Sequence, residues 1–298
     1  MNPATSLPNN QDHPHNRVSS KNRWPYLQNR VLKPLLSHLV MIVVVLFIMF
    51  PMIYAILLST QTPAEYYRMQ LFPGTAFLEN ARQVWSQVKM DQLLWNTISV
   101  ALAVATGKII LSIIGAFAFV YFDFKGKTLI FILILVTHML PLEVRLVPTF
   151  ELLDNLGWVN DFKSLTIPFF ASATGILLFR QLYQTIPPTL ADAARMDGAG
   201  PLQFLGYVVL PLSRTNIAAL FLIEFIFMWN QYLWPLVIAN SPETRMIQIG
   251  LKQLVATDAA VEWHLVMSGV VIAALPPLIL LLLLQKNLIQ GIALYEDK

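Results

Sequence analysis

Long apolar runs alternate with short polar segments along this chain of 298 residues. A helix needs about 20 apolar residues to cross the hydrocarbon core of a bilayer. By that criterion the sequence predicts six membrane spans, at 35–58, 93–121, 128–147, 164–186, 213–239 and 265–285. Several runs contain proline, namely Pro51, Pro141, Pro168, Pro235, Pro276 and Pro277. Because proline removes a helix hydrogen bond, we expect kinks or breaks there. The predicted fold is an all-α integral membrane protein with six transmembrane helices.

The first 34 residues differ from the rest in being polar, with Pro3, Pro8 and Pro14 and five basic residues from Arg17 to Lys33. This composition predicts a disordered cytoplasmic tail over 1–34, followed by the membrane domain over 35–298. No short apolar core with a small-residue cleavage site lies near Met1. We therefore expect the first apolar run to be kept as an anchor.

The positive charges predict an orientation for the six spans. If the N terminus is cytoplasmic, twelve of the 20 Lys and Arg residues fall on the cytoplasmic side and six fall outside. The remaining two, Lys108 and Arg145, fall at membrane depth. Since cytoplasmic loops carry an excess of Lys and Arg, this orientation is favoured. Both termini and the loop between the fourth and fifth spans would then be cytoplasmic.

Composition excludes several kinds of site. The chain is 56% hydrophobic and 12% charged, as expected for a membrane protein. It has no cysteine, and its five histidines lack metal-ligand spacing, so we expect no metal site. The net charge is only +3, and the Lys and Arg residues lie between apolar runs and are not gathered on one face. We therefore expect lipid contacts but no nucleic-acid partner. Gly107-Lys108 is no phosphate loop. Leu102 stands where that motif requires Gly, and Ile109 stands where it requires Ser or Thr.

The polar segment 187–212, between the fourth and fifth spans, has the pattern of two short helices around a turn. Thr189, three residues before Asp192, suggests a side-chain cap at the start of the first helix. Ala193 and Ala194 are small and favour helix, and Gly198 can take the left-handed conformation that ends it. The second helix has four apolar residues whose spacing predicts one apolar face: Leu202, Phe204, Leu205 and Val208.

The spacing within this segment resembles the cytoplasmic coupling loop of ABC importer permeases. That consensus runs E-A-A, three residues, Gly, nine residues, Ile, one residue, Leu-Pro. The residues at these positions are Asp192, Ala193, Ala194, Gly198, Val208, Leu210 and Pro211, and Asp197 begins a D-G-A sequence that supports the same resemblance. One departure is Asp192, which stands where the family has Glu. The resemblance implies the type I importer permease fold and contact with an ATPase, whereas the alternative is an amphipathic loop in the headgroup layer.

Three further segments extend the resemblance over nearly the whole chain. Trp229 to Leu236 reads W-N-Q-Y-L-W-P-L, which resembles a signature of the maltose-type carbohydrate importer permeases. Together with Met139 to Arg145 and Phe179 to Gln181, it resembles the permeases of bacterial sn-glycerol-3-phosphate importers. This resemblance implies a subunit of the bacterial inner membrane that carries glycerol-3-phosphate or a related glycerophosphodiester. A neutral sugar or oligosaccharide is the alternative cargo.

The resemblance also implies partners: a sister permease that forms a heterodimer with this chain, two copies of a cytoplasmic ATPase, and an external substrate-binding protein. ATP and Mg would be bound by the ATPase, since this chain has no nucleotide motif. An ion-driven secondary transporter is a competing hypothesis, with Glu224 and Lys108 as coupling charges, but a loop suited to a partner argues against it. A membrane enzyme would need a catalytic constellation, and the sequence offers none.

Charged and aromatic residues in the spans suggest the substrate path. Glu143 and Arg145 follow Pro141 at a depth where charge is costly, so Arg145 either meets a phosphate or forms an ion pair or gate contact near the external surface. Glu224 is expected to pair with Lys108 in a structural role. Three residues of the fifth span either contact the cargo or pack within the protein: Trp229, Asn230 and Tyr232. His138 is expected to be a packed core histidine.

Overall fold

The computed structural model describes residues 33–255 and 261–293, and all its elements there are helical. The chain forms two compact units, residues 1–54 and 55–298. The elements are α2 (Lys33–Ser59), α3 (Pro63–Tyr67), α4 (Phe77–Val88), α5 (Met90–Tyr121), α6 (Lys127–His138), α7 (Leu142–Asn155), α8 (Phe162–Thr166), η2 (Ile167–Phe169), α9 (Ala173–Thr185), α10 (Pro188–Met196), α11 (Pro201–Phe204), η3 (Leu205–Val209), α12 (Leu210–Leu212), α13 (Arg214–Trp229), α14 (Leu233–Ile238), α15 (Ile247–Gln253) and α16 (Trp263–Ala293).

The described part of the first unit is the helix α2 up to Tyr54. Its side chains from Leu35 to Tyr54 are all exposed, and nearly all of them are apolar. A helix that is apolar on every side is suited to lipid. Residues 1–32 of the expected tail lie outside the described residues. Lys33 and Pro34, which were expected in that tail, belong to α2 instead, because proline fits the first turn of a helix.

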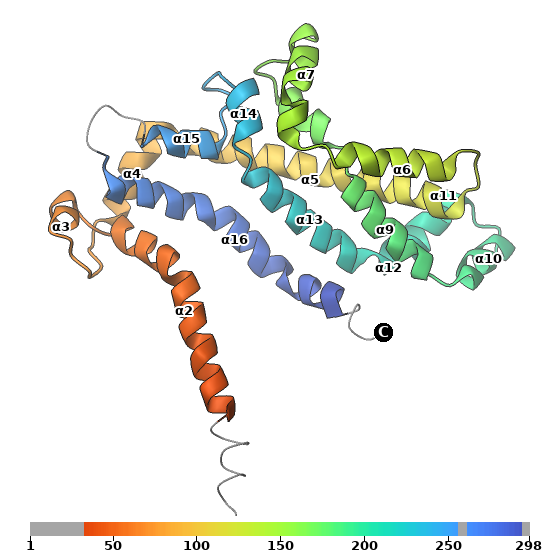
Figure 1. The fold of residues 1–298 in the computed structure, drawn as a ribbon, viewed down its shortest axis with the longest axis horizontal. Helices are drawn as coiled ribbons and strands as arrows, with labels where there is room; N and C mark the ends of the chain where they lie inside the picture. The colour runs from red at the N-terminus through yellow and green to blue at the C-terminus, as the bar shows by residue number, and fades with distance from the viewer. Residues whose placement is uncertain (1–32, 256–260, 294–298) are drawn as a thin grey trace, which may run out of the picture. The chain divides into compact units, whose positions relative to one another are not determined.

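The second unit is built around α5. This helix packs against α9 and α13, and α13 packs in turn against α16 (Figure 1). The approach of α5 to the η2 segment depends on Gly107, because a Cβ there would lie 2.6 Å from Cδ1 of Phe170. One hydrophobic core surrounds Trp229 and Trp234, and a second surrounds Phe179 near the α10–α12 end. Both cores include residues of α5 and α13, the helices that carry Lys108 and Glu224.

The predicted third span, 128–147, is interrupted near Pro141, where a kink or break was expected. The helix α6 ends at His138, and α7 leaves it at an angle of 98° (Figure 1). Pro141 explains the break, because its ring disfavours helical conformation at Leu140, and its own ψ of 150° is extended. The predicted kink is therefore a sharp bend, and Arg145 lies on the far side of it.

The predicted fifth span, 213–239, is also interrupted. The helix α13 ends at Trp229, and α14 begins at Leu233. Pro235 cannot donate to the carbonyl of Gln231 four residues earlier, and its ring would clash with that carbonyl. Asn230 reinforces the end of α13, since its Nδ2 donates to the carbonyl oxygen of Ile226 at 3.0 Å. Residues 230–232, which follow Trp229, therefore form the break between two helices.

Despite these breaks, the described residues supply up to six membrane spans, as predicted. Three single helices are long and apolar enough to cross a bilayer: α2, α5 and α16. Three bent pairs meet the same test, namely α6 with α7, the α8–η2 segment with α9 at 40°, and residues 201–212 with α13 at 76°. The helix α16 continues through Pro276 and Pro277.

The segment between α2 and α4 is held by polar contacts. Asn80 Nδ2 donates to the carbonyl oxygens of Ser59 and Gln61, at 3.0 and 2.8 Å. At the start of α3, Thr62 and Glu65 form a reciprocal capping box. The backbone N–H of Thr62 donates to the Glu65 carboxylate, and this bond, with one from the Thr62 hydroxyl, lowers the pKa of Glu65. This turn is therefore fixed without apolar burial.

Candidate functional site

The segment 187–212 begins with the helix α10, whose N-cap lies two residues earlier than the expected Thr189. Pro188 is its first residue and Pro187 its N-cap, and no side chain caps it. The predicted cap by Thr189 is therefore wrong. Proline at the first helical position explains the difference, because its fixed φ suits a helix and it has no N–H to be capped.

Gly198 turns the chain at the end of α10, as predicted. Its φ is +77°, in the left-handed region. The N–H of Gly198 donates to the carbonyl oxygen of Arg195 at 3.0 Å, and that of Ala199 donates to Ala194 at 2.9 Å. These bonds satisfy carbonyls at the end of the helix. Glycine is favoured here by its backbone conformation alone, since a Cβ would meet nothing within 4 Å.

The second part of the segment is less regular than predicted. Phe204 and Leu205 are buried, but Leu202 is 79% exposed, so the expected single apolar face is wrong at Leu202. Leu202 lies in α11, before the π-helical turn η3 that separates α11 from α12. A π turn changes the register of the residues within it, so α-helical spacing does not carry through η3, where Val209 is buried and Val208 only half-buried.

The helix α10 has one face toward its own chain and one face free in this chain. Ala191 and Ala194 line a cavity of 290 Å³ together with aromatic residues such as Phe117 and Phe204. Asp192, Ala193 and the 88% exposed Met196 lie on the other side. The Asp192 carboxylate accepts from Arg195 Nη1 at 3.3 Å, in an exposed ion pair. The free face carries the small side chain of Ala193 and the charged side chain of Asp192, and a protein partner can contact it.

The predicted coupling residues also include Asp197, Leu210 and Pro211. Asp197 is the exposed C-cap of α10, Leu210 is half-buried in α12, and Pro211 is exposed. Leu210 packs against the second hydrophobic core. The segment is thus anchored through Leu210, while Asp197 and the α10 face remain available for contact.

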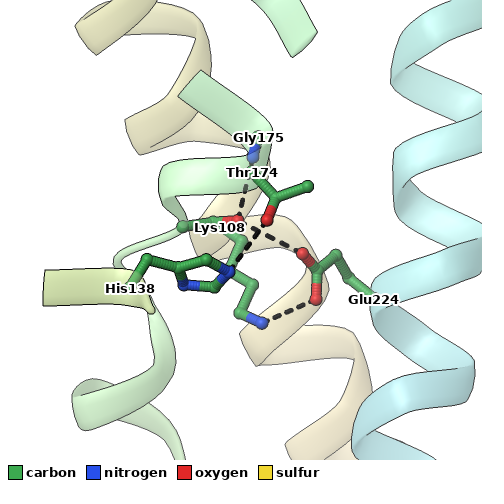
Figure 2. A network of polar contacts seen from close by, with 6 residues as sticks. Lys108, His138, Thr174, Gly175 and Glu224 are labelled. Atoms are coloured by element: carbon green, nitrogen blue, oxygen red, sulfur yellow. Dashed lines mark hydrogen bonds and ion pairs between the residues drawn. The ribbon is translucent and has the colours of Figure 1, made fainter. Parts of the chain in front are cut away.

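The predicted pair of Lys108 and Glu224 is confirmed. Lys108 Nζ lies 2.6 Å from Oε2 of Glu224, and both residues are 7% exposed (Figure 2). Oε1 of Glu224 accepts a hydrogen bond from the Ser172 hydroxyl at 3.2 Å, and that oxygen in turn accepts from the N–H of Gly175 at 3.1 Å. Helices α5, α9 and α13 are joined by this network. Each charge is paired, as burial requires.

A cavity of 110 Å³ beside this pair brings together residues from distant parts of the chain. Lys108 of α5, His138 at the end of α6 and Arg145 of α7 all line it. His138 is exposed and shares a hydrogen bond of 2.9 Å with the Thr174 hydroxyl, so its expected place in a packed core is wrong. The bend after α6 explains this, because it ends the helix at His138.

Glu143 and Arg145 are not paired with each other. Both lie in α7 with exposed side chains, and neither belongs to an ion pair among residues 33–255 and 261–293. Because they are two residues apart in one helix, they point in different directions. Arg145 lines the 110 Å³ cavity and Glu143 does not. The expected alternative of an ion pair between them is therefore wrong.

The three fifth-span residues lie in three different environments. Trp229 is 2% exposed and stacks on Phe225 with ring centroids 5.7 Å apart, so it is part of the core. Asn230 caps α13. Tyr232 lines a separate groove, where its hydroxyl lies 2.6 Å from Lys252 Nζ. The structure therefore does not bring these residues together with Arg145.

Sequence reasoning places Arg145 on the substrate path but does not place Lys108, His138 or Thr149 there, although all three line the 110 Å³ cavity. The position of Lys108 at membrane depth is a signal of function as well as of its ion pair. Thr149, also in the lining, had no signal in the sequence that marked it. It lies four residues after Arg145, so both share one face of α7. The bend that brings this face to the cavity could not be predicted from spacing.

Comparison with known proteins identifies the class and then the family. The fold matches a solved bacterial ABC transporter involved in the import of the acidic polysaccharide alginate, with a TM-score of 0.72, 22% identity, and coverage of 86% of this chain and 96% of that one. At that identity the match shows the fold alone, which is that of an ABC importer permease. Residues 108–294 match the family described as binding-protein-dependent transport system inner membrane component, and the chain belongs to that family.

Two relatives in that family are similar over almost their full length. The chain is 41% identical over 276 residues to the sn-glycerol-3-phosphate transport system permease protein UgpE of Rhizobium meliloti (strain 1021). It is 38% identical over 275 residues to the UgpE protein of Escherichia coli O1:K1 / APEC. Each match covers 89% of this chain and 98% of the relative. The chain is therefore a transport subunit of an inner membrane.

Proposed function

We propose that this chain is a permease subunit of an ATP-driven importer for sn-glycerol-3-phosphate or a related glycerophosphodiester. The observation that supports this cargo is the identity of about 40% to permeases named for sn-glycerol-3-phosphate transport, over 89% of the chain. The break at Pro141 and the break before Pro235 lie in two of the three segments whose resemblance suggests this cargo. The Arg145 side chain lines a cavity beside the first of these breaks.

The proposal includes a path for force from an ATPase. The face of α10 that carries Asp192 and Ala193 contacts the ATPase, while Ala191 and Ala194 pack on the chain's own aromatic residues. Movement of α10 would then pass directly to α5 through Phe117. Two ATPase copies hold ATP and Mg, one under this chain and one under a sister permease. An external binding protein delivers the cargo, and both termini lie in the cytoplasm.

Uptake by intact cells tests the cargo. A strain that lacks this gene should lose uptake of radiolabelled glycerol-3-phosphate, and the gene on a plasmid should restore it. A neutral disaccharide tested in the same strains serves as the comparison. Loss of disaccharide uptake with glycerol-3-phosphate uptake intact would show that the neutral-sugar alternative is correct.

Crosslinking tests the contact with the ATPase. The chain contains no cysteine, so a single one can be introduced on either face of α10. Ala193→Cys on the exposed face should crosslink to the ATPase in the assembled complex. Ala191→Cys, which lines the internal cavity, is the matched control and should not. Equal crosslinking from both positions, or none from Ala193→Cys, would contradict the assigned face.

A further inference from the structure

The 110 Å³ cavity between α5, α7, the η2 region and α14 is lined by cations without a carboxylate. Lys108 and Arg145 are its charged members, His138 adds an imidazole, and Thr149 adds a hydroxyl. Neither Glu224 nor Glu143 is in the lining. A group that enters this space therefore meets positive charge and hydrogen-bond donors on its polar side, and aromatic rings such as Phe169 elsewhere.

Lys108 is held at the cavity wall by contacts behind it. Glu224 Oε2 lies 2.6 Å from Nζ, and the Phe227 ring lies under the same nitrogen at 4.8 Å from its centroid. The other oxygen of Glu224 is occupied by Ser172. An ammonium has three donors. Its charge is balanced by Glu224, and its position is fixed before any ligand arrives.

Arg145, in contrast, has no carboxylate in ion-pair contact with it within the described part of the chain. With Lys108 neutralised by Glu224, the guanidinium gives the cavity an uncompensated positive charge. A guanidinium fork matches two oxygens of a phosphate or carboxylate in one plane. Thr149 lies on the same face of α7, one turn away, where its hydroxyl can add a further hydrogen bond.

We propose that this cavity binds the phosphate group of the cargo, with Arg145 as the principal contact and Lys108 as a second one that Glu224 positions. The cavity can hold about three or four water molecules at roughly 30 Å³ each, which is enough space for a phosphate group. This inference rests on the proposed function, because it takes the cargo to be a glycerol phosphate. It assigns to this subunit a direct contact with the anionic end of that cargo.

Thiol labelling tests the charge of the cavity without a transport assay. Ala171 lines the cavity, and Ala171→Cys would be the only cysteine of the chain. In the detergent-purified complex we expect it to react at least about tenfold faster with an anionic sulfonatoethyl methanethiosulfonate than with the cationic trimethylammonium reagent. Both rates are divided by those at the exposed Ser86→Cys, which corrects for reagent reactivity. Arg145→Gln should remove the preference, and glycerol-3-phosphate should slow labelling only while Arg145 is present. Equal rates for the two reagents would overturn the proposal.

Uptake by the reconstituted complex separates this inference from the proposed cargo. Arg145→Gln should reduce glycerol-3-phosphate uptake by about ten- to a hundredfold, since a charge-assisted hydrogen bond is lost. Arg82→Gln, which removes the same charge from the exposed face of α4, is the matched control. If the unmodified complex takes up no glycerol-3-phosphate, the proposed cargo is wrong. If it does, and Arg145→Gln behaves like Arg82→Gln, the cargo stands and the phosphate site is wrong.

Discussion

Glu224→Gln should destabilise the second unit strongly, because it leaves the buried Lys108 with a charge and no partner. The pair is 2.6 Å long and its side chains are each 9% exposed, so little solvent screens it. Removing one member of such a pair costs about 3–5 kcal/mol. Replacing both by uncharged residues, as in Lys108→Met with Glu224→Gln, should recover most of that loss. Thermal unfolding of the purified complex in detergent measures both effects.

The exposed pair of Lys163 and Asp161 provides a matched control. Its atoms are 3.7 Å apart, and the two side chains are 58% and 39% exposed. Lys163→Met should therefore change stability by less than about 1 kcal/mol. The reasoning would be refuted if Glu224→Gln unfolded at the same temperature as Lys163→Met. It would also be refuted if the stability losses of the single variants Glu224→Gln and Lys108→Met simply added in the double variant. Paired charges predict that the two losses are coupled.

Three further changes test separate parts of the structure. Gly198→Val should uncouple ATP hydrolysis from uptake, since a β-branched residue is strained at a φ of +77°, whereas Gly198→Asn should be tolerated; equal activity of the two would contradict this. Asp192→Glu should keep uptake and Asp192→Lys should lose it. Equal loss of ATP-driven uptake in the two variants would show that the shorter side chain of Asp192 is required. Gly107→Val should lower the yield of folded complex on size exclusion, because its side chain would meet the Phe170 ring, and an unchanged yield would argue against that close contact.

Three features could be predicted from the sequence: the number of spans, the turn at Gly198, and the ion pair of Lys108 and Glu224. Each depends on neighbouring residues or on a strong energetic rule. Apolar length alone gives up to six spans. Gly198 was predicted to be left-handed from its place after a short helix. Lys108 and Glu224 were predicted to pair because an unpaired charge in a span is costly. In each case one local or general constraint decides the outcome.

Other features depend on three-dimensional packing and could not be read from spacing. The sequence predicts a break at Pro141, but it does not give the direction of the 98° turn, and that turn places Arg145 and Lys108 in the lining of one cavity. Leu202 fits an apolar face by α-helical spacing, yet its side chain is 79% exposed. Trp229 could stack on a cargo or in a core, and only its contact with Phe225 decides for the core.

The most direct test of the central claim is uptake into sealed proteoliposomes. The vesicles contain this chain, the sister permease and the ATPase, with Mg-ATP enclosed on the ATPase side and loaded binding protein added outside. Radiolabelled glycerol-3-phosphate should accumulate against its gradient with ATP and not with ADP, and omission of this chain should abolish accumulation. Accumulation that persists without this chain, or that an ion gradient drives in place of ATP, would contradict the account.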